Sequence, residues 1–133
     1  MDSVVHFNMP AQDRERVSKF YEKVFGWTMK QYGPEMGNYI LAYTAETDEQ
    51  GMIKKPGAIN GGFFTKSERD NITKLTIAVD DIEAAMKKVV EAGGTIIGGT
   101  KAGQVEVTPG LGKFIDIRDS EGNIVNLMEP ERK

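Results

Sequence analysis

The chain has 133 residues, the size of one ordinary globular domain with its own hydrophobic core. Its 17 Lys and Arg against 20 Asp and Glu give a formal net charge of −3, which argues against nucleic acid or an anionic membrane as a partner. The absence of cysteine excludes disulfides and thiol nucleophiles, and the single histidine excludes any metal centre that needs two histidines from one chain. No signal-peptide pattern or membrane-spanning apolar run is present, so we expect a cytoplasmic protein.

The first half of the chain predicts a strand, a helix and three further strands. A β-rich run at Val4–Met9 comes first, and apolar residues at helical spacing then follow from Asp13 to Gly26, a glycine typical of a helix C-terminus. The further strands are expected at Trp27–Tyr32, Asn38–Thr44 and Ala58–Thr65.

The second half predicts the same order of elements. A strand at Leu75–Val79 precedes a helix that begins at Asp80 or Asp81 and ends at Gly93–Gly94. Strands are then expected near Thr95–Ile97 or slightly later, and at Gln104–Val107, Lys113–Arg118 and Asn123–Glu129. We therefore predict an α+β domain built from two βαβββ modules, about residues 1–67 and 68–133.

Six short segments, spread over the whole chain, carry a family resemblance. They are Val5–Phe7, Phe20–Tyr21, Val24–Trp27, Val79–Asp81, Ala92–Gly94 and Arg118–Asn123. Together they resemble the vicinal-oxygen-chelate superfamily, which includes glyoxalase I, extradiol dioxygenases and the bleomycin- and fosfomycin-resistance proteins. The resemblance implies curved mixed sheets around a cleft that binds a small molecule, and it implies a two-fold homodimer.

Metal-using members of this family take one ligand from the first strand and one from the last strand of each module. The corresponding residues here are His6 and Lys74 on first strands, and Gly61 (or Asn60) and Asn126 on last strands. A protonated lysine repels a cation, glycine has no side chain, and an amide oxygen binds divalent ions more weakly than a carboxylate. The resemblance, combined with these replacements, therefore predicts no metal and no other cofactor.

Alternation along the strands separates two sets of side chains. Phe7 and Ile77 belong to apolar faces that we expect to pack under the helices. The candidates for lining the cleft lie on the opposite faces or on the last strands: His6, Asn8, Asn60, Gly61, Lys74, Thr76 and Asn126. Glu129 alternates with Asn126 and falls on the other face, which argues against it as a ligand.

Three functions remain open from the sequence. The first is binding of a small organic molecule without a catalytic metal, as the resemblance to the resistance proteins implies. The second is a metal-dependent lyase, isomerase or dioxygenase with a divalent metal on His6, Asn126 and a carboxylate, for which the options are Glu106, Asp116 and Glu129. The third is a non-catalytic interaction module. No catalytic residue is assigned in any of the three.

Overall fold

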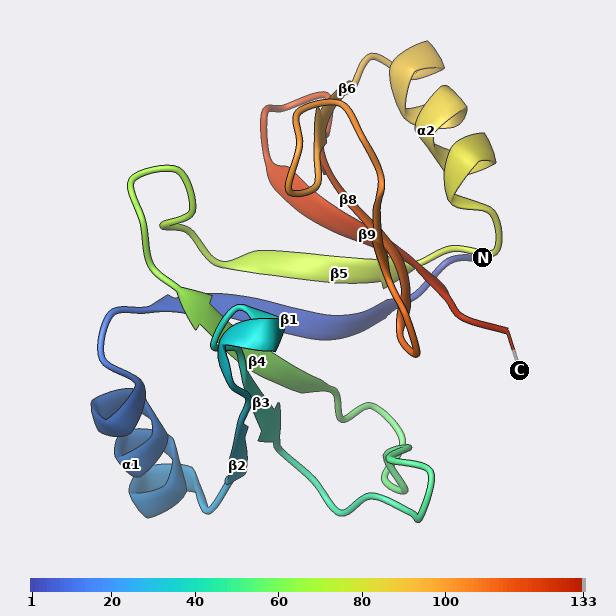
Figure 1. Ribbon diagram of the computed structural model, residues 1–133. Helices are drawn as coiled ribbons and strands as arrows, with labels where there is room; N and C mark the ends of the chain where they lie inside the picture. The colour runs from blue at the N-terminus through green and yellow to red at the C-terminus, as the bar shows by residue number, and fades with distance from the viewer. Residues whose placement is uncertain (133) are drawn as a thin grey trace. The chain divides into compact units, whose positions relative to one another are not determined.

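The computed structural model describes residues 1–132 (Figure 1). The chain divides into two compact units. The first unit is His6–Thr73, and the second unit combines Met1–Val5 with the chain from Lys74 onward. Each unit combines one α-helix with a set of parallel and antiparallel strands, so the α+β class is confirmed.

The first unit follows the order strand, helix, three strands. Its elements are β1 (Val4–Ala11, whose first two residues fall in the second unit), α1 (Arg14–Phe25), β2 (Thr28–Gln31), the short 3-10 helix η1 (Pro34–Met36), β3 (Ile40–Tyr43) and β4 (Asn60–Thr65). The strands lie in the sheet order β2-β3-β4-β1, in which β4 and β1 are parallel and the other neighbours antiparallel.

The second unit repeats this arrangement with one added strand. Its elements are β5 (Lys74–Ala78), α2 (Ile82–Glu91), β6 (Thr95–Gly98), β7 (Glu106–Thr108), β8 (Gly112–Arg118) and β9 (Ile124–Pro130). The sheet order is β6-β8-β9-β5, again with the last pair parallel, and β7 pairs with β8. Apart from β7, the order and the strand directions match those of the first unit, which confirms the predicted βαβββ repeat.

Both helices begin at a capping aspartate, and α1 ends at a glycine. The side chain of Asp13 accepts a hydrogen bond from Arg16 N at 3.0 Å, and the side chain of Asp81 accepts one from Ala84 N at 3.0 Å. Each satisfies a backbone N–H that has no partner inside the helix. Helix α1 ends at Gly26, whose φ of 74° suits a residue without Cβ.

The apolar face of each sheet packs against its own helix, as the alternation predicts. In the first unit, Phe7 and Met9 of β1 pack with Val17 and Tyr21 of α1 around the buried Phe63. In the second unit the corresponding residues are Ile77, Val79, Ile82, Ala85 and Leu127. The opposite faces of β1 and β5 therefore hold the polar residues.

Some local features differ from the sequence prediction. Strand β3 begins at Ile40 and not at Asn38, β4 begins at Asn60 and not at Ala58, and β7 begins at Glu106 and not at Gln104. The segment before β3 contains η1, which was not predicted. Neither helix in residues 1–132 is long and apolar enough to cross a bilayer.

Candidate functional site

The polar face of the first unit is organised around the single histidine. His6 Nε2 lies 2.9 Å from Tyr39 Oη, and Tyr39 Oη donates to Asn8 Oδ1 at 2.8 Å. Burial lowers the pKa of His6 below its ordinary value of 6.5 and raises the pKa of Tyr39. Both side chains are therefore uncharged at pH 7, and the three residues form a neutral hydrogen-bonded chain.

The register of β1 against β4 decides which last-strand residue shares the face of His6. His6 pairs with Asn60, and Phe7 pairs with Gly61. A Cβ on Gly61 would lie 2.2 Å from the ring of Phe7, so Gly61 belongs to the helix-packed face. Asn60, the alternative position, shares the face of His6. Its Oδ1 accepts a hydrogen bond from Thr44 N at 3.0 Å and so anchors the end of β3.

Gly62 explains how the ring of Tyr39 reaches His6. Gly62 is paired with Asn8 and lies on the same face, and a Cβ on it would be 1.9 Å from Tyr39 Oη. Any side chain at position 62 would occupy the space of the phenol group. The sequence signal for this contact is the Gly61–Gly62 pair. Gly61 accommodates the ring of Phe7 on one face of β4, and Gly62 accommodates the ring of Tyr39 on the other.

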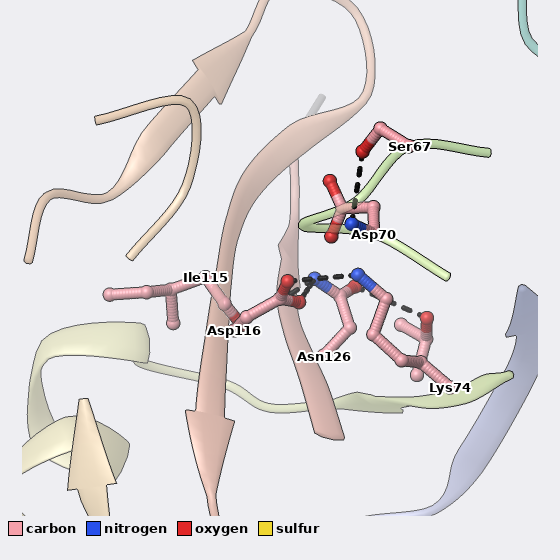
Figure 2. A network of polar contacts seen from close by, with 7 residues as sticks. Ser67, Asp70, Lys74, Ile115, Asp116 and Asn126 are labelled. Carbon is pink, nitrogen blue, oxygen red and sulfur yellow. Dashed lines mark hydrogen bonds and ion pairs between the residues drawn. The ribbon is translucent and has the colours of Figure 1, made fainter. Parts of the chain in front are cut away.

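The polar face of the second unit carries a salt bridge linked to two further side chains (Figure 2). Lys74 Nζ lies 2.9 Å from Asp116 Oδ2, and Asn126 Nδ2 donates to Asp116 Oδ1 at 3.0 Å. Thr76 Oγ1 donates to Asn126 Oδ1 at 3.1 Å. The Lys74 and Asp116 side chains are only 11% and 20% exposed, so this four-residue cluster is largely shielded from water.

These residues do not fit a divalent metal. Both oxygens of Asp116 accept hydrogen bonds, and the ammonium of Lys74 already neutralises its charge. The amide oxygen of Asn126 accepts a hydrogen bond from Thr76, so the oxygen atoms that could bind a metal are already engaged with other side chains. Within residues 1–132, no group of three or more His, Asp or Glu side chains is placed to hold a metal ion.

The carboxylates considered as alternative ligands lie in three different environments. Asp116 is the one that contacts Asn126. Glu129 Oε1 accepts from Ile82 N at 3.0 Å at the start of α2, which confirms that Glu129 and Asn126 lie on opposite faces of β9. Glu106 is exposed on β7.

Two residues that complete these clusters, Asp116 and Tyr39, are not predicted from the sequence in these roles. Asp116 is predicted only as an alternative metal ligand, yet it is the salt-bridge partner of Lys74. The β8–β9 hairpin carries a signal for its contact with Asn126, because the two positions are equidistant from the turn centred near Glu121. Tyr39 lies 33 residues from His6, and no periodic pattern links them.

Comparison with known proteins identifies relatives that match most of the chain. The sequence model of the Glyoxalase/Bleomycin resistance protein/Dioxygenase superfamily matches residues 3–127. A "Glyoxylase-like domain-containing protein" from Didymella fabae is 30% identical over 120 residues, which cover 86% of this chain and 84% of the relative.

Solved structures with similar folds include methylmalonyl-CoA epimerases. The epimerase from Mycobacterium tuberculosis has a TM-score of 0.64 at 14% identity, over 97% of this chain and 88% of that one. Another methylmalonyl-CoA epimerase, in complex with methylmalonyl-CoA and NH4+, has a TM-score of 0.67 at 12% identity, over 98% and 95%. At such identities these structures establish the fold alone.

Proposed function

Because the chain belongs to the Glyoxalase/Bleomycin resistance protein/Dioxygenase superfamily, we propose that it binds a small organic molecule and that it does so without a catalytic divalent metal. The observation that carries the metal-free part is the ion pair of Lys74 and Asp116, with Asn126 bonded to the same carboxylate. The family's first-strand and last-strand positions in the second unit are thereby engaged with protein partners.

The charge of Lys74 opposes a second cation at this place. A divalent ion about 4 Å from the ammonium would meet a repulsion on the order of 8 kcal/mol at the effective dielectric typical of a protein surface. A metal would have to displace Lys74 from Asp116 and the hydroxyl of Thr76 from Asn126 before it found two oxygen ligands. Both displacements add to the cost of binding.

The first unit supports an organic ligand. Its polar face presents the uncharged hydrogen-bonding groups of His6, Tyr39 and Asn8. Such groups recognise polar functional groups of an organic molecule and fix its orientation. Solved structures of the same fold contain methylmalonyl-CoA or 2-nitronate-propionyl-CoA, so the fold accommodates organic ligands.

Metal titration tests the metal-free proposal. Protein freed of metal with a chelator is titrated calorimetrically with Ni²⁺, Zn²⁺, Mn²⁺, Fe²⁺ and Co²⁺, and we expect no one-to-one binding that depends on His6. Glu91→Gln, at the exposed end of α2, serves as the control for adventitious surface binding. Tight stoichiometric binding that His6→Ala abolishes and Glu91→Gln leaves intact would favour the metal-dependent lyase, isomerase or dioxygenase instead.

Thermal denaturation against a library of small organic molecules tests the binding proposal. A ligand at 100 times its Kd stabilises the folded state by about 2.7 kcal/mol, which raises the Tm of a domain of this size by about 10 °C. We expect at least one chemical class to produce such a shift. If no class does so, the interaction-module alternative gains support. Mass spectrometry of the bound compounds after incubation then distinguishes a binder from an enzyme.

A further inference from the structure

The hydrogen-bonded chain of His6, Tyr39 and Asn8 has a direction that the chemistry of its groups determines. A phenol has one hydrogen, and Tyr39 Oη donates it to Asn8 Oδ1, an atom that can only accept. Tyr39 Oη therefore accepts at its contact with His6, and the hydrogen between the two residues belongs to His6 Nε2. A neutral imidazole carries one N–H, so the other ring nitrogen, Nδ1, has a free lone pair.

Within residues 1–132 that lone pair has no hydrogen-bond partner. The only polar contact of the His6 side chain within residues 1–132 is the one with Tyr39. Nδ1 is not among the fully buried side-chain nitrogen and oxygen atoms without a partner, so it is accessible to solvent and to a bound molecule. His6 Nδ1 is therefore a position where a bound molecule gains a hydrogen bond that the protein alone does not supply.

The hydrogen-bonded side chains of His6, Tyr39 and Asn8 are held in place by the residues around them. The phenol of Tyr39 is held over β4 because Gly62 carries no Cβ, and Asn8 comes from the same strand and face as His6. Tyr39 touches His6 Nε2 and not Nδ1, so it acts as a positioning residue that selects the tautomer.

We propose that His6 Nδ1 accepts a hydrogen bond from the ligand, and that the ligand is a neutral molecule with a hydroxyl or N–H donor at this point. This inference rests on the proposed function, since it names the chemistry of the molecule that the site binds. A carboxylate or phosphate oxygen facing the ring would meet a lone pair and no hydrogen, which disfavours anions at this position.

The tautomer is tested first, in the protein without ligand. Because His6 is the only histidine, ¹⁵N-labelled histidine gives one imidazole spin system in long-range ¹H–¹⁵N spectra. We expect the Nε2–H form at pH 7, with an Nε2 proton that exchanges slowly with water. Tyr39→Phe removes the acceptor, so that this proton exchanges too fast to be detected. An Nδ1–H form or an imidazolium in the wild-type protein would overturn the proposal.

Tyr43→Phe is the matched control for this measurement. Tyr43 is the last residue of β3, and its hydroxyl makes no hydrogen bond within the described chain. The variant should keep the slow Nε2 proton. If Tyr43→Phe removes the proton as well, the loss reflects a general loosening of the fold and not the contact of Tyr39 with His6.

Three monosubstituted benzenes then test the ligand class: phenol, anisole and benzoate. Phenol has a donor, anisole has the same ring without one, and benzoate is an anion. We expect phenol alone to shift the Nδ1 resonance, and we expect Tyr39→Phe to reduce that shift by at least half. An equal shift with anisole or benzoate, or no shift with phenol, would overturn the proposal.

The two proposals fail in different ways. If the probes move backbone amide resonances of β1 and β4 but leave Nδ1 unchanged, small-molecule binding stands and the role of Nδ1 is refuted. If no compound in the thermal screen stabilises the protein and no probe moves any amide, binding itself is refuted, and the inference about Nδ1 is refuted with it.

Discussion

Replacement of Gly62 by alanine should disrupt the cluster around His6. The added Cβ would lie 1.9 Å from Tyr39 Oη and 2.2 Å from Tyr39 Cζ, so the ring has to move. Overpacking of this kind costs about 1–3 kcal/mol. Loss of the two hydrogen bonds of Tyr39 adds about 0.5–1.5 kcal/mol each. The sum, about 2–6 kcal/mol, is a large part of the stability of a typical domain.

The assay is urea denaturation of a double-mutant cycle in Gly62→Ala and Tyr39→Ala. Tyr39→Ala removes the ring and the clash together, and alanine is otherwise at least as favourable as glycine inside a strand. Gly62→Ala should therefore cost less than about 1 kcal/mol in the Tyr39→Ala background. An equal cost in both backgrounds would refute the reasoning, because the ring of Tyr39 would then not be the reason for a glycine at position 62.

Three further predictions concern the charged and titratable groups. Lys74→Met leaves the carboxylate of Asp116 without its cation and should lower the free energy of unfolding by about 1–3 kcal/mol. The double variant Lys74→Met with Asp116→Leu should recover most of the lost stability. A double variant as unstable as the single one would contradict the salt bridge between Lys74 and Asp116. Glu129→Ala should lower the free energy of unfolding by about 1 kcal/mol, because the hydrogen bond to the start of α2 is lost. Lys113→Ala should lower it by less than about 0.5 kcal/mol, since the Lys113 side chain is half-exposed and its Nζ lies 3.8 Å from Glu129. Equal costs of the two variants in urea denaturation would show that the ion pair matters instead. Because burial lowers the pKa of His6, the unfolded chain binds the proton more readily than the folded one, so stability should fall as pH drops below about 6.5 and level off once the folded protein is protonated too. Denaturation midpoints between pH 8 and pH 5 should show this slope in the wild type and a shallower one in His6→Gln, and equal slopes would count against a buried neutral histidine.

The secondary structure was predictable because its signals are local. The apolar spacing of the two helices, the aspartates at their starts and Gly26 at the end of α1 all act within one or two turns. Strand alternation likewise predicted which face of β1 and β5 packs under a helix. The repeat followed from the order of elements alone, and the sheet order of each unit confirms it.

The register of β4 shows where alternation fails. Asn60, Gly61 and Gly62 offer only one side chain in three positions, so the sequence carries no pattern that assigns a face to each residue. From the sequence, Gly61 and Asn60 are therefore alternatives for the last-strand position. The register of β4 is determined by residues far away in the sequence. The ring of Phe7 covers Gly61, and the phenol of Tyr39 covers Gly62.

The side-chain partners of the candidate residues were unpredictable for a related reason. Lys74 and Asp116 are 42 residues apart, and His6 and Tyr39 are 33 residues apart. Each contact depends on the register of several strands, and none of these registers is determined by a local sequence pattern. The residue types at the family positions predicted that the family's metal ligands are replaced. They did not indicate which side chains would form hydrogen bonds with the replacing residues.

The salt bridge of Lys74 also has a consequence for how the protein is produced and stored. The positive charge beside Asp116 is part of the polypeptide, so it is present in every copy as soon as the chain folds. No insertion factor, transporter or trace-element supply is needed to put this charge there. Preparations grown in mineral-poor and mineral-rich media should therefore carry the same ammonium group beside Asp116, and dialysis should not remove it.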